Sequence, residues 1–180
     1  QTQFREFIHA FVASGRPVIG ICNGFQALVK AGILPGEPQN LQATLTFNAS
    51  GHFECRWVTL RANPNNPSAW LRDLPEIYCP VAHGEGRFLM AEGSSLPTEQ
   101  IALQYHLQDG TPANGLYPFN PNGSPNDIAG ITNLAGNVLG LMPHPENHIH
   151  PYQHPQWTRS AHPKGNGLGL TLFENALKRF

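Results

Sequence analysis

Residues 20–24, Gly-Ile-Cys-Asn-Gly, place a thiol between an apolar run and a helical pattern. The apolar run over residues 17–21 predicts a short buried strand, and the spacing of apolar residues over 25–32 predicts a helix that ends at residues 35–36, Pro-Gly. A nucleophile on a sharp strand-to-helix turn, with a small residue two positions away on either side, is the nucleophile elbow of G-x-S-x-G enzymes. Here the nucleophile would be Cys22.

The predicted elbow gives Cys22 a chemical advantage. A thiol at a helix N-terminus meets free N–H groups and the positive end of the helix dipole, which stabilise the reactive thiolate. Because the turn is tight, we expect Gly20 and Gly24 to be required, since side chains there would clash. The five residues alone also fit a small, buried and inert cysteine, so the prediction of a nucleophile needs a second feature.

That feature lies at residues 141–146, Leu-Met-Pro-His-Pro-Glu, which follow another apolar run. Two prolines fix the backbone on either side of His144 and place it in a rigid turn at a strand end. Glu146 is two residues further on and could reach the ring nitrogen of His144 that faces away from a thiol. A thiol nucleophile needs a base and an acid that orients the base, and such partners meet in space rather than in sequence. We therefore predict a catalytic triad of Cys22, His144 and Glu146.

Length and composition predict a single globular domain. The chain has 180 residues, a formal net charge of −1 and 13% charged residues, which gives no basic surface for nucleic acid. Three cysteines are too few for a disulfide framework, so a reducing, cytoplasmic location is expected. No apolar run approaches the roughly 18 residues that span a membrane, and the first ten residues read as an amphipathic helix rather than a signal peptide.

The order of the predicted elements favours an α/β fold. Helix and strand alternate at the start and a β-rich insert occupies the middle, which predicts a mainly parallel sheet flanked by helices, with antiparallel additions. The long loop at residues 108–127 is rich in Asn, Gly and Pro, and its length favours a functional or partner-contacting role. Helices are expected at the first twelve residues and at 168–180, and strands at 41–47, 53–60, 77–82, 87–90, 101–107, 128–132 and 137–142. The first two strands are expected as a hairpin or a pair of strands, and the last two as a hairpin.

Three motifs resemble the glutaminase subunits of phosphoribosylformylglycinamidine synthase (the PurQ family), which belong to the class I glutamine amidotransferases. They stand in the family's order: Gly-Ile-Cys-Asn-Gly-Phe-Gln at 20–26, His-Gly-Glu-Gly-Arg-Phe at 83–88 and Gly-Leu-Met-Pro-His-Pro-Glu at 140–146. Residues 53–57, 117–124 and 167–170 are also similar, so the resemblance covers nearly the whole chain. It implies the flavodoxin-like fold of class I amidotransferases over residues 1–180.

The resemblance implies hydrolysis of the side-chain amide of glutamine to glutamate and ammonia. Cys22 would form a thioester with the substrate, His144 would carry the proton, and Glu146 would orient His144. The backbone N–H of Asn23, followed by Gly24, would form one side of an oxyanion hole. Gln26 matches the family position that contacts bound glutamine.

The resemblance also implies partners. The large synthetase subunit (PurL), with a small PurS-type subunit, would use the ammonia to convert formylglycinamide ribonucleotide to formylglycinamidine ribonucleotide in de novo purine biosynthesis. ATP and magnesium would belong to that synthetase, and no cofactor or metal is expected in this chain, whose sequence has no G-x-x-x-x-G-K loop. Neither a nucleic-acid nor a membrane partner is expected.

Two departures from the family stand out. In the family, a strand and a Gly-rich loop that supplies a second oxyanion donor precede the helix at which this chain begins, so residues 1–180 read as an N-terminally truncated domain. Because one oxyanion donor is worth roughly 10²–10³ in rate, weak activity is expected of such a chain. Asn147 stands where the family commonly has Arg, which puts a salt bridge at that position in question.

Some residues and functions admit more than one interpretation. His83, Gly84, Glu85 and Gly86 fit either a wall of the glutamine pocket, or a surface facing the synthetase, or a plain glycine turn. The three histidines at 148, 150 and 154 could hold a metal, although the prolines at 151 and 155 favour a solvated or partner-facing loop. Another class I amidotransferase, a cysteine hydrolase of related fold and a non-catalytic binding subunit remain alternative functions.

Overall fold

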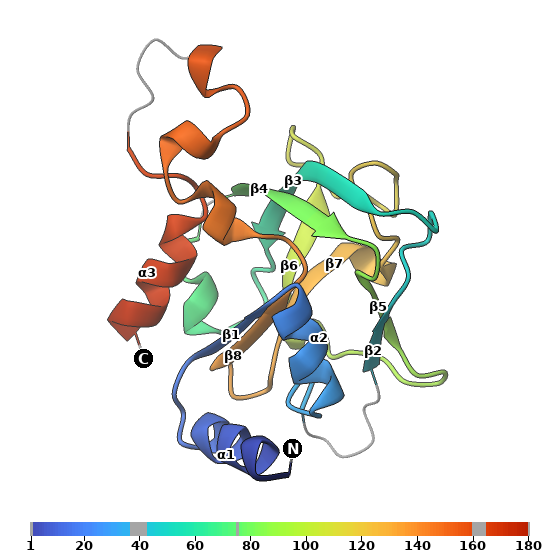
Figure 1. Cartoon of the computed structure of the whole chain (residues 1–180), viewed down its shortest axis with the longest axis vertical. Helices are drawn as coiled ribbons and strands as arrows, with labels where there is room; N and C mark the ends of the chain where they lie inside the picture. The colour runs from blue at the N-terminus through green and yellow to red at the C-terminus, as the bar shows by residue number, and fades with distance from the viewer. Residues whose placement is uncertain (1, 37–42, 75, 160–164, 180) are drawn as a thin grey trace.

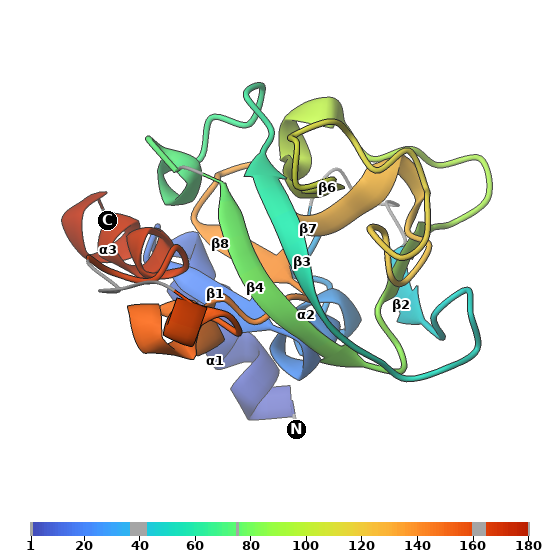
Figure 2. The ribbon, with the colours of Figure 1, turned by 90° about the horizontal axis from the view of Figure 1, so that it is seen from above.

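A six-stranded sheet forms the centre of the computed structural model, which describes residues 2–36, 43–74, 76–159 and 165–179 (Figures 1 and 2). The strand order is β1-β8-β7-β6-β3-β4. The bounds are β1 Val18–Ile21, β3 Glu54–Ala62, β4 Ile77–His83, β6 Ile101–His106, β7 Ile128–Thr132 and β8 Val138–Leu141.

The α/β prediction is correct, but the predicted mainly parallel sheet is wrong. Only β1 and β8 run parallel among the described strands, and the other four neighbouring pairs are antiparallel. Parallel neighbours need a crossover of a dozen or more residues, whereas short turns join antiparallel strands. The turn at residues 133–137 between β7 and β8 is of the short kind, and the predicted hairpin there is confirmed.

A second, two-stranded sheet pairs β2 (Ala43–Thr46) with β5 (Arg87–Met90). Of the two interpretations of residues 41–47 and 53–60, the pair of strands is confirmed and the hairpin is wrong, because β3 belongs to the central sheet; residues 41 and 42 lie outside the described part. The physical reason lies in Asn48, two residues after the end of β2. Its backbone N–H donates to Gly84 O at 2.9 Å, so the chain is tied to the β4–β5 connection instead of folding back on itself.

Three α-helices pack around the sheet: α1 (Thr2–Ala13), α2 (Asn23–Lys30) and α3 (Leu170–Arg179). Gly15 follows α1 with φ +79°, as expected of a helix C-cap. In α3, Leu172 is fully buried, whereas Leu177 is 88% exposed. Short 3₁₀ helices complete the chain: η1 Ala69–Leu71, η2 Thr98–Gln100, η3 Pro125–Asp127, η4 Pro145–His148, η5 Pro151–Gln153 and η6 Trp157–Arg159.

Strand β8 separates the two parts of the hydrophobic core. Leu139 and Leu141 pack into a cluster with β3, β4, β6 and α3, while Val138 packs into a cluster with α2 and β5. Gly140 lies under α2, where a Cβ atom would collide with the ring of Phe25. This close approach sets α2, and the turn at its start, against the end of β8. No helix in the described part of the chain is long and apolar enough to cross a membrane.

Candidate active site

Cys22 occupies the sharp turn between β1 and α2, which confirms the predicted strand–turn–helix. Its backbone angles are φ 51° and ψ −108°, a conformation that costs a non-glycine residue on the order of 1–3 kcal/mol. Two hydrogen bonds hold it: Cys22 N donates to Leu141 O at 2.8 Å, and Gln26 N donates to Cys22 O at 3.1 Å. The strained turn thus lies between the end of β8 and the first turn of α2, as in a nucleophile elbow.

The two glycines of the elbow play different parts. A Cβ atom at Gly20 would lie 2.5 Å from Leu28 Cδ1 and 2.7 Å from Gly24 O, so only glycine fits. At Gly24, such a Cβ atom would have no described atom within 4 Å other than its chain neighbours and the backbone of its own helix. The expected clash is therefore found at Gly20 and is wrong for Gly24.

His144 and Glu146 lie beside the elbow. His144 Nδ1 and Glu146 Oε1 are 2.7 Å apart, and because a carboxylate only accepts, Nδ1 donates. The His144 backbone N–H donates to Pro80 O at 2.8 Å, which fixes the turn onto β4. The structure therefore holds the imidazole with its other nitrogen, Nε2, available for the thiol.

Charge and hydrogen bonding raise the pKa of His144 to about 9. The largest cause is its interaction with the Cys22 side chain, followed by its hydrogen bond to Glu146, while burial opposes both. Among the described residues Nε2 finds no partner at strict hydrogen-bond geometry, so the contact with the thiol is loose. Loose contacts of this kind are common in unliganded enzymes. The structure brings Cys22, His144 and Glu146 together in the order thiol, base and acid.

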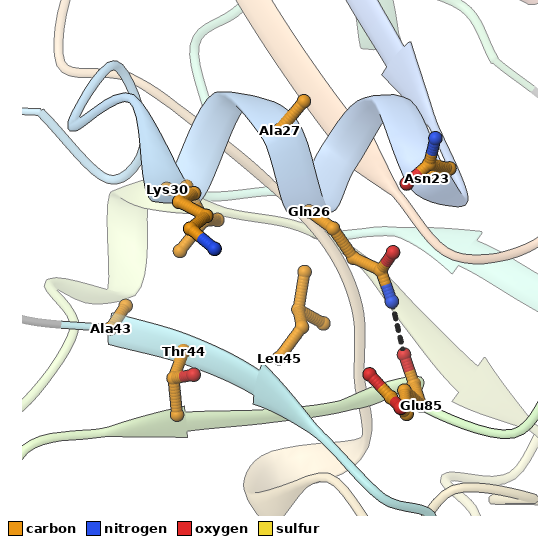
Figure 3. Close-up of a pocket in the computed structure, with 9 residues that line it drawn as sticks. Asn23, Gln26, Ala27, Lys30, Ala43, Thr44, Leu45 and Glu85 are labelled. Atoms are coloured by element: carbon orange, nitrogen blue, oxygen red, sulfur yellow. Dashed lines mark hydrogen bonds between the residues drawn. The ribbon is translucent and has the colours of Figure 1, made fainter.

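Residues 83–86 form the wall opposite the start of α2. Gln26 Nε2 donates to Glu85 O at 2.8 Å, which links the two segments directly (Figure 3). Ala82 O lies 3.9 Å from Cys22 Sγ, so the end of β4 also contacts the Cys22 side chain. At Gly86 a Cβ atom would come within 2.5 Å of the His83 ring. These contacts favour a wall of the site over a plain glycine turn.

A pocket of about 560 Å³ opens between α2, β2 and this wall. It begins at Asn23, the residue after the nucleophile, and reaches Lys30 at the far end of α2 (Figure 3). Cys22 and His144 are not among its lining residues, so the pocket adjoins the reacting groups and does not enclose them. The lining residues are Asn23, Gln26, Ala27, Val29, Lys30, Ala43, Thr44, Leu45 and Glu85.

Asn48 is a residue that sequence reasoning missed, because it reads as part of a turn. Its Nδ2 donates to His52 O and to His83 O, each at 2.8 Å. Its Oδ1 accepts from Gly86 N at 3.0 Å and lies 3.0 Å from His83 Nδ1. One buried side chain thereby holds both ends of the 83–86 wall. In the sequence, Asn48 is visible only as a polar residue after a predicted strand, and this position does not indicate which distant residues it binds.

The loop at residues 108–127 supports the same wall. Asn122 is fully buried, and its Nδ2 donates to Gly86 O at 2.8 Å and to Tyr105 Oη at 3.0 Å. Asp127 accepts from the backbone N–H groups of Asn114 and Gly115 at 2.6 and 2.8 Å, which closes the loop. The loop thus stabilises residues 83–86 through the hydrogen bond from Asn122 to Gly86. The predicted contact of this loop with a partner stays a prediction.

The histidines at 148, 150 and 154 do not share one environment. His148 is buried, its Nδ1 bonds to Tyr78 O, and its ring packs against Trp57 and His154. A solvated loop is therefore the wrong interpretation for His148, although His150 is exposed. Within the described residues, no group of three or more His, Cys, Asp or Glu side chains is placed to hold a metal ion.

The two remaining cysteines differ from each other. Cys79 is fully buried in β4, and burial, reinforced by the negative charge of Glu146, raises the pKa of its thiol well above the ordinary value. Cys55 is exposed on β3. Cys79 therefore stays a thiol, and Cys22 is the cysteine with a base beside it.

Comparison with known proteins places this geometry in a family. The family described as the CobB/CobQ-like glutamine amidotransferase domain matches residues 1–180. The chain is 53% identical over 166 residues to phosphoribosylformylglycinamidine synthase subunit PurQ of Treponema denticola, covering 81% of this chain and 61% of the relative. It is 45% identical over 175 residues to the same subunit of Dehalococcoides mccartyi, covering 96% and 67%. The chain therefore spans about two thirds or less of these relatives.

Solved structures agree with the sequence relatives. The structure of PurLQS from Thermotoga maritima contains a chain that superposes with a TM-score of 0.70 at 29% identity, covering 96% of this chain and 66% of that one. A glutamine amidotransferase from the same organism superposes with a TM-score of 0.52 at 17% identity, covering 99% and 68%, which supports the fold alone.

The two elbow glycines make a matched pair for a stability test. We expect Gly20→Ala to lower the free energy of unfolding by roughly 1–3 kcal/mol, because the new methyl group meets Leu28 and the Gly24 carbonyl. Gly24→Ala should cause no loss, since the site is open and alanine favours a helix by up to about 1 kcal/mol. Urea unfolding of both variants checks this, and equal losses would contradict the proposed packing.

The raised pKa of His144 predicts a pH-dependent stability. A pKa of about 9 in the folded protein, above the ordinary 6.5, gives a stabilisation that is full below pH 6.5 and is lost as the pH rises through about 9. Glu146→Gln removes one cause of the shift. The difference in unfolding free energy from wild type should therefore be largest near pH 6 and shrink toward pH 10.

Urea unfolding at intervals from pH 6 to pH 10 measures that difference. Glu174→Gln is the control, because Glu174 pairs with Lys178 on the exposed side of α3 and lies outside the site. The difference in unfolding free energy between Glu174→Gln and wild type should be smaller and should not change between pH 6 and pH 9. A flat difference for Glu146→Gln over the same range would show that Glu146 does not stabilise the protonated His144.

Proposed function

The chain belongs to the CobB/CobQ-like glutamine amidotransferase family, and we propose that it is the glutaminase part of a phosphoribosylformylglycinamidine synthase. The observation that carries this proposal is the placement of His144 and Glu146 beside Cys22 on a strained elbow. The PurQ relatives support the choice of this branch of the family. We further propose that residues 1–180 act as one class I amidotransferase domain.

The reaction begins at the thiol. His144, whose pKa is raised to about 9 by its interactions with the Cys22 side chain and with Glu146, takes the proton of the Cys22 thiol. The thiolate attacks the carboxamide carbon of glutamine and forms a carbon–sulfur bond, and negative charge moves to the carbonyl oxygen. The backbone N–H of Asn23, at the start of α2, is the oxyanion donor that this chain supplies.

Collapse of the tetrahedral intermediate breaks the carbon–nitrogen bond. The Nε2 proton of His144 passes to the nitrogen, ammonia leaves, and a γ-glutamyl thioester remains on Cys22. His144, now neutral, takes a proton from water, whose oxygen attacks the thioester and releases glutamate and the thiolate. Glu146, bonded to Nδ1 at 2.7 Å, keeps the ring in the required tautomer through both steps.

We also propose the route of the product. The Thermotoga maritima neighbour is a PurLQS structure, which supports partners of the PurL and PurS type for this chain. The synthetase would combine the ammonia with formylglycinamide ribonucleotide to give formylglycinamidine ribonucleotide. ATP and magnesium would act there, and the whole assembly would work in the cytoplasm.

Covalent labelling tests the proposed function. A glutamine analogue with an electrophilic diazoketone should modify Cys22 once per chain, because the thiolate forms a thioether where it would form a thioester. Cys22→Ala should abolish the adduct, and His144→Ala should slow it by roughly 10² or more. Intact-mass and peptide mass spectrometry of the full gene product, with its synthetase partner present, measure both.

Cys55→Ser is the matched control, since Cys55 is an exposed cysteine on β3 that is not part of the proposed triad. It should label at the wild-type rate. Labelling at Cys55 in place of Cys22, or no adduct at all with the partner bound, would favour a non-catalytic subunit of the same fold.

A further inference from the structure

His83, at the end of β4, is a buried imidazole that the mechanism above does not use. It is 4% exposed. Its neighbours in sequence lie against the site: Ala82 O is 3.9 Å from Cys22 Sγ, and Glu85 O accepts from Gln26. The His83 and His144 rings also lie close enough that charge on His144 lowers the pKa of His83. His83 therefore belongs to the shell around the reacting groups.

Hydrogen bonding to Asn48 determines which nitrogen of His83 carries the proton. Asn48 Nδ2 donates to two carbonyl oxygens, and Asn48 Oδ1 accepts from Gly86 N, so the orientation of this amide is fixed by backbone groups. The atom 3.0 Å from His83 Nδ1 is then an oxygen, which can only accept. His83 Nδ1 must carry the hydrogen, and Nε2 presents a lone pair.

The imidazole is also held neutral. Burial lowers the pKa of His83 to about 4; the nearby carboxylate of Glu54 opposes the shift and His144 adds to it. At neutral pH, Nε2 is thus an acceptor and not a donor. This nitrogen is buried, and no described residue donates to it. An unsatisfied buried acceptor costs on the order of 1–3 kcal/mol, which a bound donor would recover.

We propose that His83 Nε2 accepts a hydrogen bond from the carboxamide N–H of the substrate and thereby selects an amide over a carboxylate. This inference rests on the proposed glutaminase function. Glutamine offers N–H donors to the lone pair, whereas the carboxylate of glutamate offers only oxygen lone pairs, which repel it. Sites built around such a hydrogen bond discriminate strongly against an analogue that lacks it. The same acceptor would favour release of the glutamate product.

The surrounding residues fit an orienting role for His83. Gly86 makes room for the ring, since a Cβ atom there would lie 2.5 Å from both Nδ1 and Cε1. Asn48 holds the ring nitrogen and also the His83 carbonyl. The ring therefore cannot turn to exchange its two nitrogens without breaking the Asn48 bond, and the acceptor keeps one direction.

Two isosteric variants separate binding from structure. His83→Asn places an amide N–H where Nδ1 donates to Asn48 but has nothing at the Nε2 position. His83→Gln places an amide oxygen near the Nε2 position but loses the bond to Asn48. We expect H83N to keep the unfolding midpoint and to lose roughly tenfold in kcat/KM for glutamine, while glutamate inhibits it several-fold more tightly. We expect H83Q to unfold more easily yet to keep kcat/KM within about threefold of wild type.

The measurements are glutaminase kinetics, glutamate inhibition and thermal unfolding, on the full gene product with its synthetase partner. An H83N variant with wild-type kcat/KM and wild-type glutamate inhibition would overturn the inference. The inference would also be overturned if kcat/KM fell in parallel with the unfolding midpoint, so that H83Q was less active than H83N. A wild-type protein that neither hydrolyses glutamine nor accepts the diazoketone label would overturn the proposed function itself, and this inference with it.

Discussion

The parallel pairing of β1 with β8 is the constraint on which the site depends. The register sets Ile21 opposite Leu141, so the carboxyl ends of both strands lie side by side at the same end of the sheet. The chain continues from one into Cys22 and from the other, three residues later, into His144. The hydrogen bond from Cys22 N to Leu141 O extends the pairing by one step into the turn. An antiparallel β1 would send the thiol and the base to opposite ends of the sheet.

A second group of contacts brings the wall of the site to this edge. Residues 83–86 lie at the end of β4 and lead into β5. Side chains from two other segments hold them: Asn48 after β2 and Asn122 in the long loop. These bonds join groups that are some 35 residues or more apart in sequence. Because the groups are buried, loss of one partner leaves the others unsatisfied, which couples the wall to the core.

The local parts of this arrangement could be predicted from the sequence, and the non-local parts could not. The elbow at Cys22 and the rigid turn at His144 depend on glycines, prolines and apolar spacing within a few residues. The partner of β2, the direction of most strands and the role of Asn48 depend on contacts between distant segments. Hydropathy showed where the strands lie, but a strand has the same pattern whether its neighbour runs parallel or antiparallel. His148 likewise read as a loop residue because its burial comes from Trp57 and His154.

Two imidazoles in one site are pushed to opposite protonation states, and this division assigns their chemistry. His144, bonded to Glu146 and lying beside the Cys22 side chain, has a pKa of about 9 and, in the proposed mechanism, gives a proton to a leaving nitrogen. His83, buried and bonded to a neutral amide, has a pKa near 4 and can only accept at Nε2. Were both charged, the site would attract the carboxylate of its product. In the proposed reaction, one charged and one neutral ring would allow the site to donate a proton to the leaving nitrogen on one side and to present a lone pair to an amide on the other.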